Sequence, residues 1–500
     1  MNFMQSLKNE MNNQTQLTEN GAVGYKTTGK ALLDLNFSVT ALRDKSENEI
    51  ESKFVSAFYE NKMFAMKWLF YLRDREEGIG ERRTFRVIMK YLAKNHSDIA
   101  KAVLELIPEY GRFDDLWCLL DTELRSNVVT IVKKQLNKDA KNMMENKSIS
   151  LLAKWLPSLN ASSKETKRLA RIIRDDIGFT DRQYRKTLSK LRDYLNVVEV
   201  KMSAKQWGNI DYSAVPSRAN LIYNDAFLRN DEKRRREYLA ALERGDKSVK
   251  INASVLFPDE IVHKYGIGHQ LKYKDTALEE MWKALPNLGS TGNTLVVRDG
   301  SGSMEWYNGG KALDVSTALA IYMAERCEGQ FSNQFITFSR IPKLIDLTGY
   351  DTLRDKLTRT YREDDCSNTD IEAVFKLILD VAVKNNLSQE EMPKNIVIVS
   401  DMAFDASRHN FGKTLFGSIQ KMYEAKGYKI PRLIFWNVNE CATNAIPVRS
   451  NEFGVVLMSG YSANLMNMIM NGEVDPYKCL LVELNKERYQ AVEDAVKDIV

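Results

Sequence analysis

Hydrophobic residues recur at a helical period through the first half of the chain. From about residue 40, apolar side chains are spaced as a helix with one buried face requires. Further helices are predicted at about residues 98–107, 112–121, 124–136, 148–156, 164–177, 181–196, 231–244 and 275–284. Turns with Pro or Gly separate them, and no strand is predicted before about residue 290. The pattern predicts an irregular, HEAT-like array of α-helical repeats.

The pattern changes near residues 285–290, beyond which short apolar strands alternate with helices. Strands are predicted at 294–298, 334–338, 395–400, 432–438 and 454–458, and helices at 310–327, 370–385, 413–426 and 483–498. Such alternation indicates βαβ units, and nearly continuous apolar strands fit a sheet covered on both faces. The second half is therefore predicted to be a doubly wound, mainly parallel, Rossmann-like α/β domain.

These patterns divide the chain into three predicted parts. Residues 1–30 are expected to be a flexible N-terminal segment, residues 31–285 the helical domain, and residues 286–500 the α/β domain. Two domains are also the default for 500 residues, because single cores stop growing near roughly 250–300 residues.

Composition favours a cytoplasmic protein. No apolar run approaches the roughly 20 residues needed to span a bilayer, and the polar N-terminus lacks the apolar core of a secretory signal. The five cysteines are scattered and include no Cys-x-x-Cys pair, which argues against a disulfide framework or a zinc ribbon. We therefore expect a reducing environment and no contact with a membrane.

Positive charge is concentrated in the middle of the chain. The net charge is only +5, but residues 161–250 carry 21 Lys and Arg against 13 Asp and Glu. The cations at helical spacing are Lys164, Lys167, Arg168, Arg171, Arg174, Arg182, Arg185 and Lys186. Such stripes can bind RNA phosphates. The alternative is a solvated helix face, neutralised by neighbours such as Asp175 and Asp176.

Aromatic residues are interleaved with these cations, namely Tyr184, Tyr194, Trp207 and Tyr212. Their rings can stack on bases of a single strand. Together, cations and rings make residues 161–250 the candidate RNA-binding segment.

A candidate metal site follows the first predicted strand of the α/β domain. The strand at 294–298 runs directly into Asp299-Gly-Ser-Gly-Ser-Met304, and ligands of open α/β sheets bind at the carboxyl ends of strands. The glycines allow a tight turn, so that Asp299, Ser301 and Ser303 can aim their oxygens at one point. One carboxylate and two hydroxyls are an incomplete set of hard ligands, which suits Mg²⁺ or Mn²⁺.

Two other loops can add oxygen atoms to this site. Thr369 opens a predicted helix, and Asp401, at the end of the most apolar strand, can bond to metal-bound water. The alternative is that all these residues merely form turns and helix caps. With Asp299 as an exposed ligand, Asp299→Ala is expected to abolish cation dependence and leave the fold largely intact.

The segment Val296-Val-Arg-Asp-Gly-Ser-Gly-Ser-Met304, with Thr369 and Asp401 downstream, resembles the metal-ion-dependent adhesion site of von Willebrand factor A domains. The resemblance implies a von Willebrand A fold. It also implies a metal set of Asp299, Ser301, Ser303, Thr369 and Asp401, in which the Ser and Thr positions ligate directly. This chain departs from the family at Ser367-Asn368, where the family has Gly-Gly before the threonine.

Short motifs of the helical half carry a second resemblance. They include Leu72-Arg-Asp74, Gly78-Ile-Gly-Glu-Arg82, Tyr110-Gly-Arg-Phe-Asp-Asp115 and Lys201-Met-Ser-Ala-Lys-Gln-Trp207. These motifs are similar to those of Ro/TROVE RNA-binding proteins, and more closely to a related family of unassigned function in plants, fungi and viruses. In Ro proteins, a ring of helical repeats holds single-stranded RNA ends and an outer basic surface binds structured small RNA. The charged motif residues between 73 and 115 are expected to form salt bridges between repeats.

These features favour a non-enzymatic scaffold that binds small structured or single-stranded RNA and uses its metal to engage an acidic ligand. The alternative is a metal-dependent adaptor between proteins, without nucleic acid. Sequence-specific DNA binding is not expected. An enzyme is disfavoured, because the chain has no Walker phosphate loop, Gly-x-Ser-x-Gly elbow or His-Glu-x-x-His motif.

Overall fold

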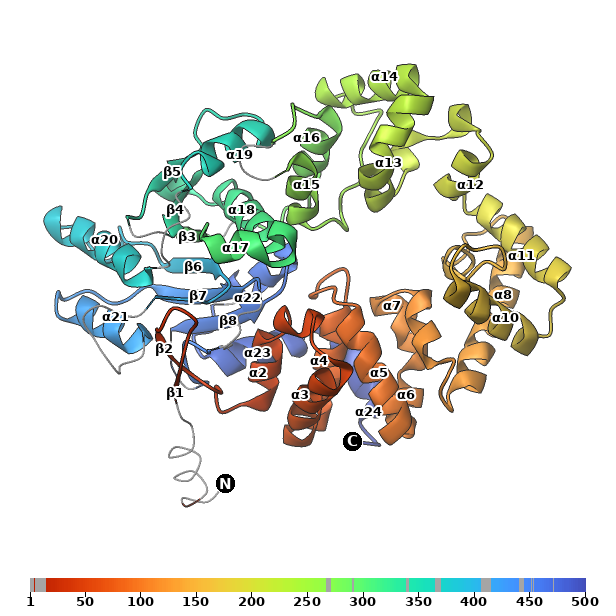
Figure 1. The fold of residues 1–500 in the computed structure, drawn as a ribbon, viewed down its shortest axis with the longest axis horizontal. Coiled ribbons are helices and arrows are strands. Elements are labelled where there is room, and N and C mark those ends of the chain that lie inside the picture. The colour runs from red at the N-terminus through yellow and green to blue at the C-terminus, as the bar shows by residue number, and fades with distance from the viewer. Residues whose placement is uncertain are drawn as a thin grey trace. The chain divides into compact units, whose positions relative to one another are not determined.

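The computed structural model divides the chain into two compact units, whose elements are drawn in Figure 1. The sheet unit comprises Met1–Asn61 and Ala253–Asn485, and the helical unit comprises Lys62–Asn252 and Lys486–Val500. The structure describes Met4 and residues 15–266, 271–289, 292–338, 341–364, 370–405, 415–439, 445–450, 452, 454–470 and 472–500. Each unit is built from two separate stretches of chain, and the domain boundaries at residues 30 and 285 stay predictions. None of the described helices combines the length and the apolar character that crossing a membrane requires.

A mainly parallel sheet forms the centre of the sheet unit. Its strands are β3 (Thr294–Asp299), β4 (Gln334–Phe338), β5 (Leu344–Asp346), β6 (Asn395–Ser400), β7 (Arg432–Asn437) and β8 (Val455–Ser459). They lie in the order β5-β4-β3-β6-β7-β8, and only β5 runs antiparallel to its neighbour. Every residue of β3 and β8 is buried, which explains the apolar runs at residues 295–297 and 455–458 within them. The predicted doubly wound α/β fold is confirmed.

Helices cover both faces of this sheet. Those of the sheet unit are α2 (Ala31–Phe37), α3 (Glu47–Glu60), α15 (Pro258–Tyr265), α16 (Thr276–Lys283), α17 (Gly302–Trp306), α18 (Lys311–Ala324), α19 (Leu353–Tyr361), α20 (Ile371–Lys384), α21 (Leu415–Glu424), α22 (Met466–Met470) and α23 (Pro476–Leu484). α18 lies on one face of the sheet, and α20 and α21 lie on the other (Figure 1). α18 is buried from Ala312 to Ala324 because it packs between β3 and α15. A helix buried on every side is expected to be largely apolar all round, as this one is.

The strand order brings two carboxylates to the same edge of the sheet. From β3 the chain moves outward through β4, then returns to the other side of β3 with β6. Ligands of such sheets bind at this reversal, beyond the carboxyl ends of the two strands. Asp299 is the last residue of β3 and Asp401 directly follows β6. Both carboxylates therefore lie at the reversal.

A short hairpin shows that the prediction of no strand before residue 290 is wrong. β1 (Thr15–Leu17) and β2 (Val23–Tyr25) pair antiparallel within the segment predicted to be flexible. Thr18 Oγ1 donates a hydrogen bond of 2.5 Å to Phe404 O, which ties the hairpin to the loop after β6. Strands of three residues show no hydrophobic period, so their formation depends on such tertiary contacts.

The helical unit is an irregular array of mostly short helices, as predicted. They are α4 (Lys62–Arg73), α5 (Arg83–Asn95), α6 (Ser97–Ala102), α7 (Ile107–Tyr110), α8 (Arg125–Met144), α9 (Leu152–Trp155), α10 (Lys164–Ile177), α11 (Asp181–Tyr194), α12 (Val198–Ser203), α13 (Ser217–Asn230), α14 (Glu232–Glu243) and α24 (Gln490–Val496), with the 3₁₀ helices η3 (Phe113–Leu119) and η10 (Glu487–Tyr489). α10 has the predicted bounds, η3 replaces a predicted helix, and α12 and α13 lie outside the predictions. In α13, buried Asn220 and Asn224 interrupt the apolar pattern, and their oxygens accept hydrogen bonds from buried Arg235 at 3.1 and 2.9 Å.

Buried ion pairs within this unit confirm the salt bridges expected for the charged motifs. Asp115 is fully buried and accepts hydrogen bonds from Arg73 Nε at 2.8 Å and Arg86 Nε at 2.7 Å. Asp74 is also fully buried, and Arg488 Nη2 donates to its Oδ1 at 2.6 Å. A buried carboxylate without such a partner costs several kcal/mol, so these pairs stabilise the array.

Candidate functional site

Asp299 is held rigidly at the carboxyl end of β3. Its side chain is fully buried. Oδ1 accepts a hydrogen bond from Ser301 N at 2.9 Å, and Oδ2 accepts one from Ser400 Oγ at 2.5 Å. The expectation that Asp299 is exposed is therefore wrong, because the neighbouring strand and the following loop enclose it.

Two serine hydroxyls and a second carboxylate lie beside Asp299. Ser301 Oγ and Ser303 Oγ are 3.0 Å apart, and the Ser303 hydroxyl hydrogen-bonds to Asp401. Asp401 is 2% exposed, and its Oδ1 also accepts from Ala403 N at 3.0 Å. The structure thus brings together Asp299, Ser301, Ser303 and Asp401.

Burial and mutual repulsion disfavour the ionised form of both carboxylates. Burial raises the pKa of Asp299 to about 7, and the charge of Asp401 raises it as well, against hydrogen bonds from Ser400 and Ser301. Burial also raises the pKa of Asp401, although a hydrogen bond from Ala403 lowers it. A bound cation would favour the ionised form of both groups.

The donor atoms at this edge fit a hard divalent cation. They are carboxylate and hydroxyl oxygens, which Mg²⁺ and Mn²⁺ prefer over nitrogen and sulfur. Across the described ranges, no cluster of three or more His, Cys, Asp and Glu side chains is placed to hold a metal ion. A cation here would therefore depend on the serine hydroxyls and on water as well as on the two carboxylates.

Thr369 lies outside the described residues, so its role as a ligand stays a prediction. The next residue, Asp370, is described, and its Oδ1 accepts a hydrogen bond from Ala373 N at 3.0 Å. Asp370 thereby caps α20, and the predicted helix after this loop is confirmed.

A buried ion pair supports the loop that carries the serines. Arg298 is fully buried, and its Nη2 donates to Asp364 Oδ2 at 3.0 Å. A Cβ atom at residue 300 would lie 2.8 Å from Asp364 Oδ1 and 2.9 Å from Arg298 Nη1. Gly300 is therefore required by the close approach of this ion pair, in addition to the flexibility that a tight turn needs.

Two residues near the carboxylates lie outside the predicted set. Ser400 donates to Asp299 and accepts a hydrogen bond from Met402 N at 3.0 Å; its sequence signal is its place directly before Asp401. Glu19, in the turn of the N-terminal hairpin, adds to the effect of burial in raising the pKa of Asp401. No sequence signal identifies Glu19, because only the folded chain brings the hairpin to this loop.

Two of the candidate RNA-binding cations are already paired with carboxylates. Arg168 Nη2 lies 2.7 Å from Asp121 Oδ2 and 2.7 Å from Glu165 Oε1. Arg174 Nη2 lies 2.6 Å from Asp175 Oδ1. For Arg168 and Arg174, the alternative of a neutralised helix face is confirmed.

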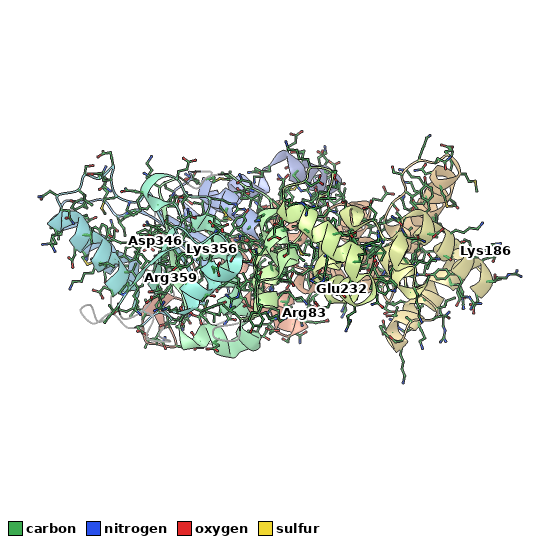
Figure 2. The ribbon with its side chains drawn as sticks, turned by 90° about the horizontal axis from the view of Figure 1, so that it is seen from above. Arg83, Lys186, Glu232, Asp346, Lys356 and Arg359 are labelled. Carbon is green, nitrogen blue, oxygen red and sulfur yellow. The ribbon has the colours of Figure 1, made fainter. Side chains whose placement is uncertain are left out.

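The other candidate cations form no ion pair within the described part of the chain. They are Lys164, Lys167, Arg171, Arg182, Arg185 and Lys186. All are exposed except Lys167, which is half-buried. Lys186 points away from α11 into solvent (Figure 2).

The structure separates the four aromatic candidates into core and surface residues. Tyr184 and Tyr212 are only 1% and 4% exposed, so the expectation that they stack on bases is wrong. The hydroxyl of Tyr184 instead donates to Pro157 O at 2.8 Å. Tyr194 is 38% exposed and Trp207 is half-buried, so these two rings reach the surface.

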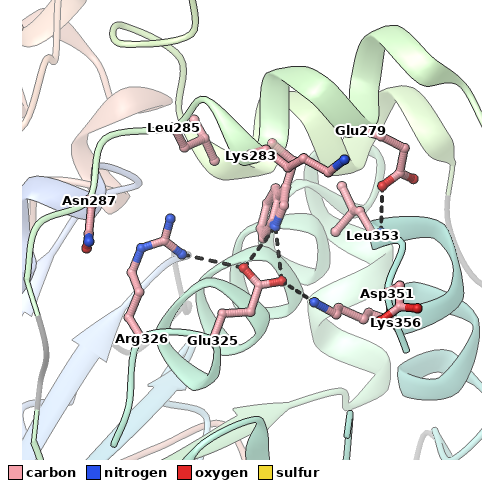
Figure 3. A pocket seen from close by; sticks show the side chains of 10 residues that line it. Glu279, Lys283, Leu285, Asn287, Glu325, Arg326, Asp351, Leu353 and Lys356 are labelled. Carbon is pink, nitrogen blue, oxygen red and sulfur yellow. Dashed lines mark hydrogen bonds and ion pairs between the residues drawn. The ribbon is translucent and has the colours of Figure 1, made fainter. Parts of the chain in front are cut away.

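A pocket of about 420 Å³ lies among α16, α18 and α19 of the sheet unit (Figure 3). Glu325 accepts hydrogen bonds from Trp282 Nε1 at 3.0 Å and from Lys356 Nζ at 2.7 Å. Glu279 accepts from Leu353 N at 2.7 Å, at the start of α19. Both carboxylates are thus engaged in the wall of the pocket, and no predicted site residue lines it.

Fold and site together define a protein with a doubly wound, mainly parallel α/β unit and an irregular helical unit. The sequence matches two families described as domains of unknown function, DUF2828 over residues 18–111 and 162–288 and DUF7788 over residues 293–498. An uncharacterized protein of Acanthamoeba polyphaga mimivirus is 32% identical over 504 residues, covering 93% of this chain and 86% of that protein. The chain belongs to the family of this viral protein.

Two solved structures show more distant similarity. The RO (RSR) protein of Deinococcus radiodurans is 16% identical with a TM-score of 0.36, covering 88% of this chain and 93% of that one. Proximal thread matrix protein 1 of the mussel byssus, solved with a zinc-occupied MIDAS motif, is 13% identical with a TM-score of 0.25 and covers 36% of this chain. The present chain spans about half of the mussel protein, 48% of its length.

Proposed function

We propose that this protein is a non-enzymatic scaffold that binds RNA through its helical unit and a divalent cation through its sheet unit. The RNA, small and structured or single-stranded, contacts α10 and α11. The cation, Mg²⁺ or Mn²⁺, is held by Asp299, Ser301, Ser303, Thr369 and Asp401. We place this activity in the cytoplasm, in keeping with five scattered cysteines that include no Cys-x-x-Cys pair.

The observation that carries the RNA proposal is the row of exposed, unpaired cations on α10 and α11. The apolar residues of α10, such as Ala170 and Ile173, are buried, so Lys164, Lys167 and Arg171 project from the polar side of the helix. α10 and α11 both pack against α8, so the two basic helices are neighbours within the helical unit. A cation without a carboxylate partner binds phosphate without first breaking an ion pair.

The cation proposal is supported by two buried carboxylates placed next to two hydroxyls. Ser400 orients Asp299, and the backbone N–H of Ala403 orients Asp401. When bound, Mg²⁺ supplies a vacant coordination position that a carboxylate oxygen of a ligand can fill. The serine hydroxyls, 3.0 Å apart, present two further oxygens at the same edge of the sheet.

RNA binding is tested by reversing four of the unpaired charges. The variant carries Lys164→Glu, Lys167→Glu, Arg171→Glu and Lys186→Glu in the full chain. Fluorescence anisotropy measures its affinity for a labelled hairpin RNA and a labelled single strand across a series of salt concentrations. We expect a large loss of affinity and a shallower dependence on salt, because each phosphate contact releases counterions.

The matched control reverses four exposed lysines elsewhere in the helical unit, namely Lys94, Lys101, Lys133 and Lys138. It changes the net charge by the same amount. Equal losses of RNA affinity in both variants would therefore show that binding depends on net charge and not on α10 and α11. Wild-type affinity no higher than that of an acidic control protein would refute RNA binding.

A protein ligand without nucleic acid is the second candidate. It is favoured by the position of the carboxylates in the sheet unit, whereas the basic helices belong to the helical unit. Affinity capture after nuclease treatment, in Mg²⁺ and in EDTA, separates the two functions. A protein partner lost in EDTA, with no RNA bound by the purified chain, would favour the adaptor.

A further inference from the structure

Two carboxylates at the start of η3 are already balanced by two arginines. Asp115 accepts hydrogen bonds from Arg73 Nε at 2.8 Å and from Arg86 Nε at 2.7 Å. Arg86 Nη2 also donates to Asp114 Oδ2 at 2.9 Å. Any further cation at this place therefore adds positive charge that these carboxylates do not fully neutralise.

Three further arginines stand around the same carboxylates. Arg82 Nη1 is 3.8 Å from Asp114 Oδ2, and its side chain is 49% exposed. Arg75 Nη1 donates to Gly111 O, a neutral group, at 3.4 Å. Within the described ranges, Arg75 and Arg112 form no ion pair. This arginine cluster, defined as Arg75, Arg82 and Arg112, carries a surplus of positive charge.

Two other carboxylates, Asp74 and Glu76, already interact with Arg488, although the charge of Glu76 also favours the ionised form of Arg75. Arg488 Nη2 donates to Asp74 Oδ1 at 2.6 Å and lies 3.2 Å from Glu76 Oε2. Asp74 and Glu76 therefore share a cation of their own.

The surplus also affects the ionisation of the arginines themselves. Burial lowers the pKa of Arg112 to about 10; the charge of Asp114 opposes this shift, and the charges of Arg75 and Arg73 contribute to it. Burial likewise lowers the pKa of Arg75, together with the charges of Arg73 and Arg218, against smaller opposing effects of Glu76 and Asp115. An anion bound here would relieve this repulsion.

Arg112 is oriented by an aromatic ring. Its guanidinium carbon lies 4.6 Å from the centroid of the Trp155 ring. Its Nε is buried without a hydrogen-bond acceptor, and Asp114 Oδ1 is buried without a donor, so this N–H group is available to a ligand. A guanidinium stacked on a ring keeps a planar edge of N–H groups, and this edge matches the oxygens of a phosphate.

We propose that Arg75, Arg82 and Arg112 form a binding site for a phosphate group, and that this phosphate belongs to an RNA strand. The naming of RNA rests on the proposed function, whereas the phosphate chemistry rests on the cluster alone. A guanidinium donates two parallel N–H groups to one phosphate, so a few arginines suffice. The site adds a second contact to that of α10 and α11.

The test removes two charges from the cluster, as Arg75→Gln with Arg112→Gln in the full chain. The matched control removes two exposed lysines of α5 and α6, as Lys94→Gln with Lys101→Gln. Anisotropy with a labelled single-stranded oligoribonucleotide gives affinity and salt dependence. Thermal melting with and without inorganic phosphate reports binding of the bare anion.

We expect the cluster variant, and not the control, to lose RNA affinity, with a salt slope lower by about one for each phosphate contact removed. We also expect phosphate to raise the melting temperature of the wild type but not of the cluster variant. If the double variant does not fold, Arg82→Gln replaces it, because this side chain is half-exposed.

The outcomes separate the two proposals. If the wild type binds RNA and the cluster variant binds it equally well, the phosphate site is overturned and the proposed function stands. If phosphate stabilises the wild type alone but no RNA binds, the phosphate site stands with a free phosphate compound as its ligand, and the proposed function fails. If the folded variants match the wild type in both assays, the site is refuted.

Discussion

Ser400 donates a hydrogen bond of 2.5 Å from its Oγ to Asp299 Oδ2, which joins the carboxyl ends of β6 and β3. This bond fixes one carboxylate oxygen and favours its ionised form. The two adjacent strands are thus connected through a side chain at the point where the sheet reverses its order.

Asp299→Asn is expected to abolish binding of Mn²⁺ while the chain keeps its fold. The amide can still accept from Ser301 N and contact Ser400 Oγ, but it carries no charge for the cation. Asp299→Ala, in contrast, should lower the free energy of unfolding by about 1–3 kcal/mol, because it leaves buried polar groups unpaired. Isothermal titration with Mn²⁺ and urea denaturation measure the two effects. Unchanged Mn²⁺ affinity in Asp299→Asn would remove Asp299 from the site.

Ser400→Ala should shift cation binding to higher pH. The pKa of Asp299 is already raised to about 7 by burial and by Asp401, and loss of the Ser400 hydrogen bond raises it further. Because a cation binds the ionised carboxylate, the midpoint of Mn²⁺ affinity against pH moves upward. Ser316→Ala is the control, since Ser316 Oγ donates to the backbone oxygen of Asp299 at 2.8 Å and not to its carboxylate. Equal midpoints in wild type and Ser400→Ala would contradict this account.

Asp314→Asn should flatten the pH dependence of stability. Burial raises the pKa of Asp314 from 3.8 to about 6, although His263 Nδ1, at 2.6 Å, lowers it. A raised folded-state pKa stabilises the protein below the unfolded pKa, and this contribution is lost as the pH rises through about 6. The loss is on the order of 3 kcal/mol, measured as the free energy of unfolding between acidic and neutral pH. Asp346→Asn, at an exposed carboxylate of β5 (Figure 2), should leave this decline in place.

Arg488→Ala should strongly destabilise the helical unit. It leaves the fully buried carboxylate of Asp74 without its cation, although Tyr489 still donates to Oδ2 at 3.0 Å. Breaking such a buried pair costs about 3–5 kcal/mol, which urea denaturation resolves. Lys497→Ala, at an exposed pair in the same segment, should change stability little. Similar effects of the two substitutions would show that Asp74 finds another partner.

The contribution of each basic residue to RNA affinity should follow its pairing. Arg182→Ala and Lys186→Ala should each lower the salt slope by about one, because both side chains are exposed and unpaired. Arg174→Ala should have a smaller effect, since Asp175 already holds this guanidinium. Anisotropy titrations of the single variants give the ranking, and an equal loss for Arg174→Ala would show that RNA displaces the carboxylate.

The sheet and its carboxylates were accessible to sequence reasoning because long apolar strands have a strong local signal. β6 begins and ends at the predicted residues. In a doubly wound sheet the carboxyl ends of parallel strands such as β3 and β6 lie at the same edge, so the meeting of Asp299 and Asp401 could be predicted. β5 is a strand of three residues with alternating exposure, which is too short for a periodic signal. The hairpin at residues 15–25 depends on Phe404, far along the chain.

Details of the candidate sites depended on partners that no local pattern reveals. Ser400 faces Asp299 because of the register between β6 and β3. Arg298 can be buried because its guanidinium is paired with the carboxylate of Asp364. Tyr184 was expected to stack on bases because it lies between cations in the sequence. In the structure it is a core residue, and its hydroxyl donates a hydrogen bond to a backbone carbonyl. Hydrophobic period thus predicts elements well, whereas the side-chain partners emerge only when the elements pack.

Residues 486–500 belong to the helical unit that begins at Lys62. Arg488 lies 414 residues after Asp74, so a ribosome makes the buried carboxylate long before the cation that pairs with it. The sheet unit likewise combines residues 1–61 with the much later residues 253–485. Each unit therefore completes its fold only after its second stretch has been synthesised.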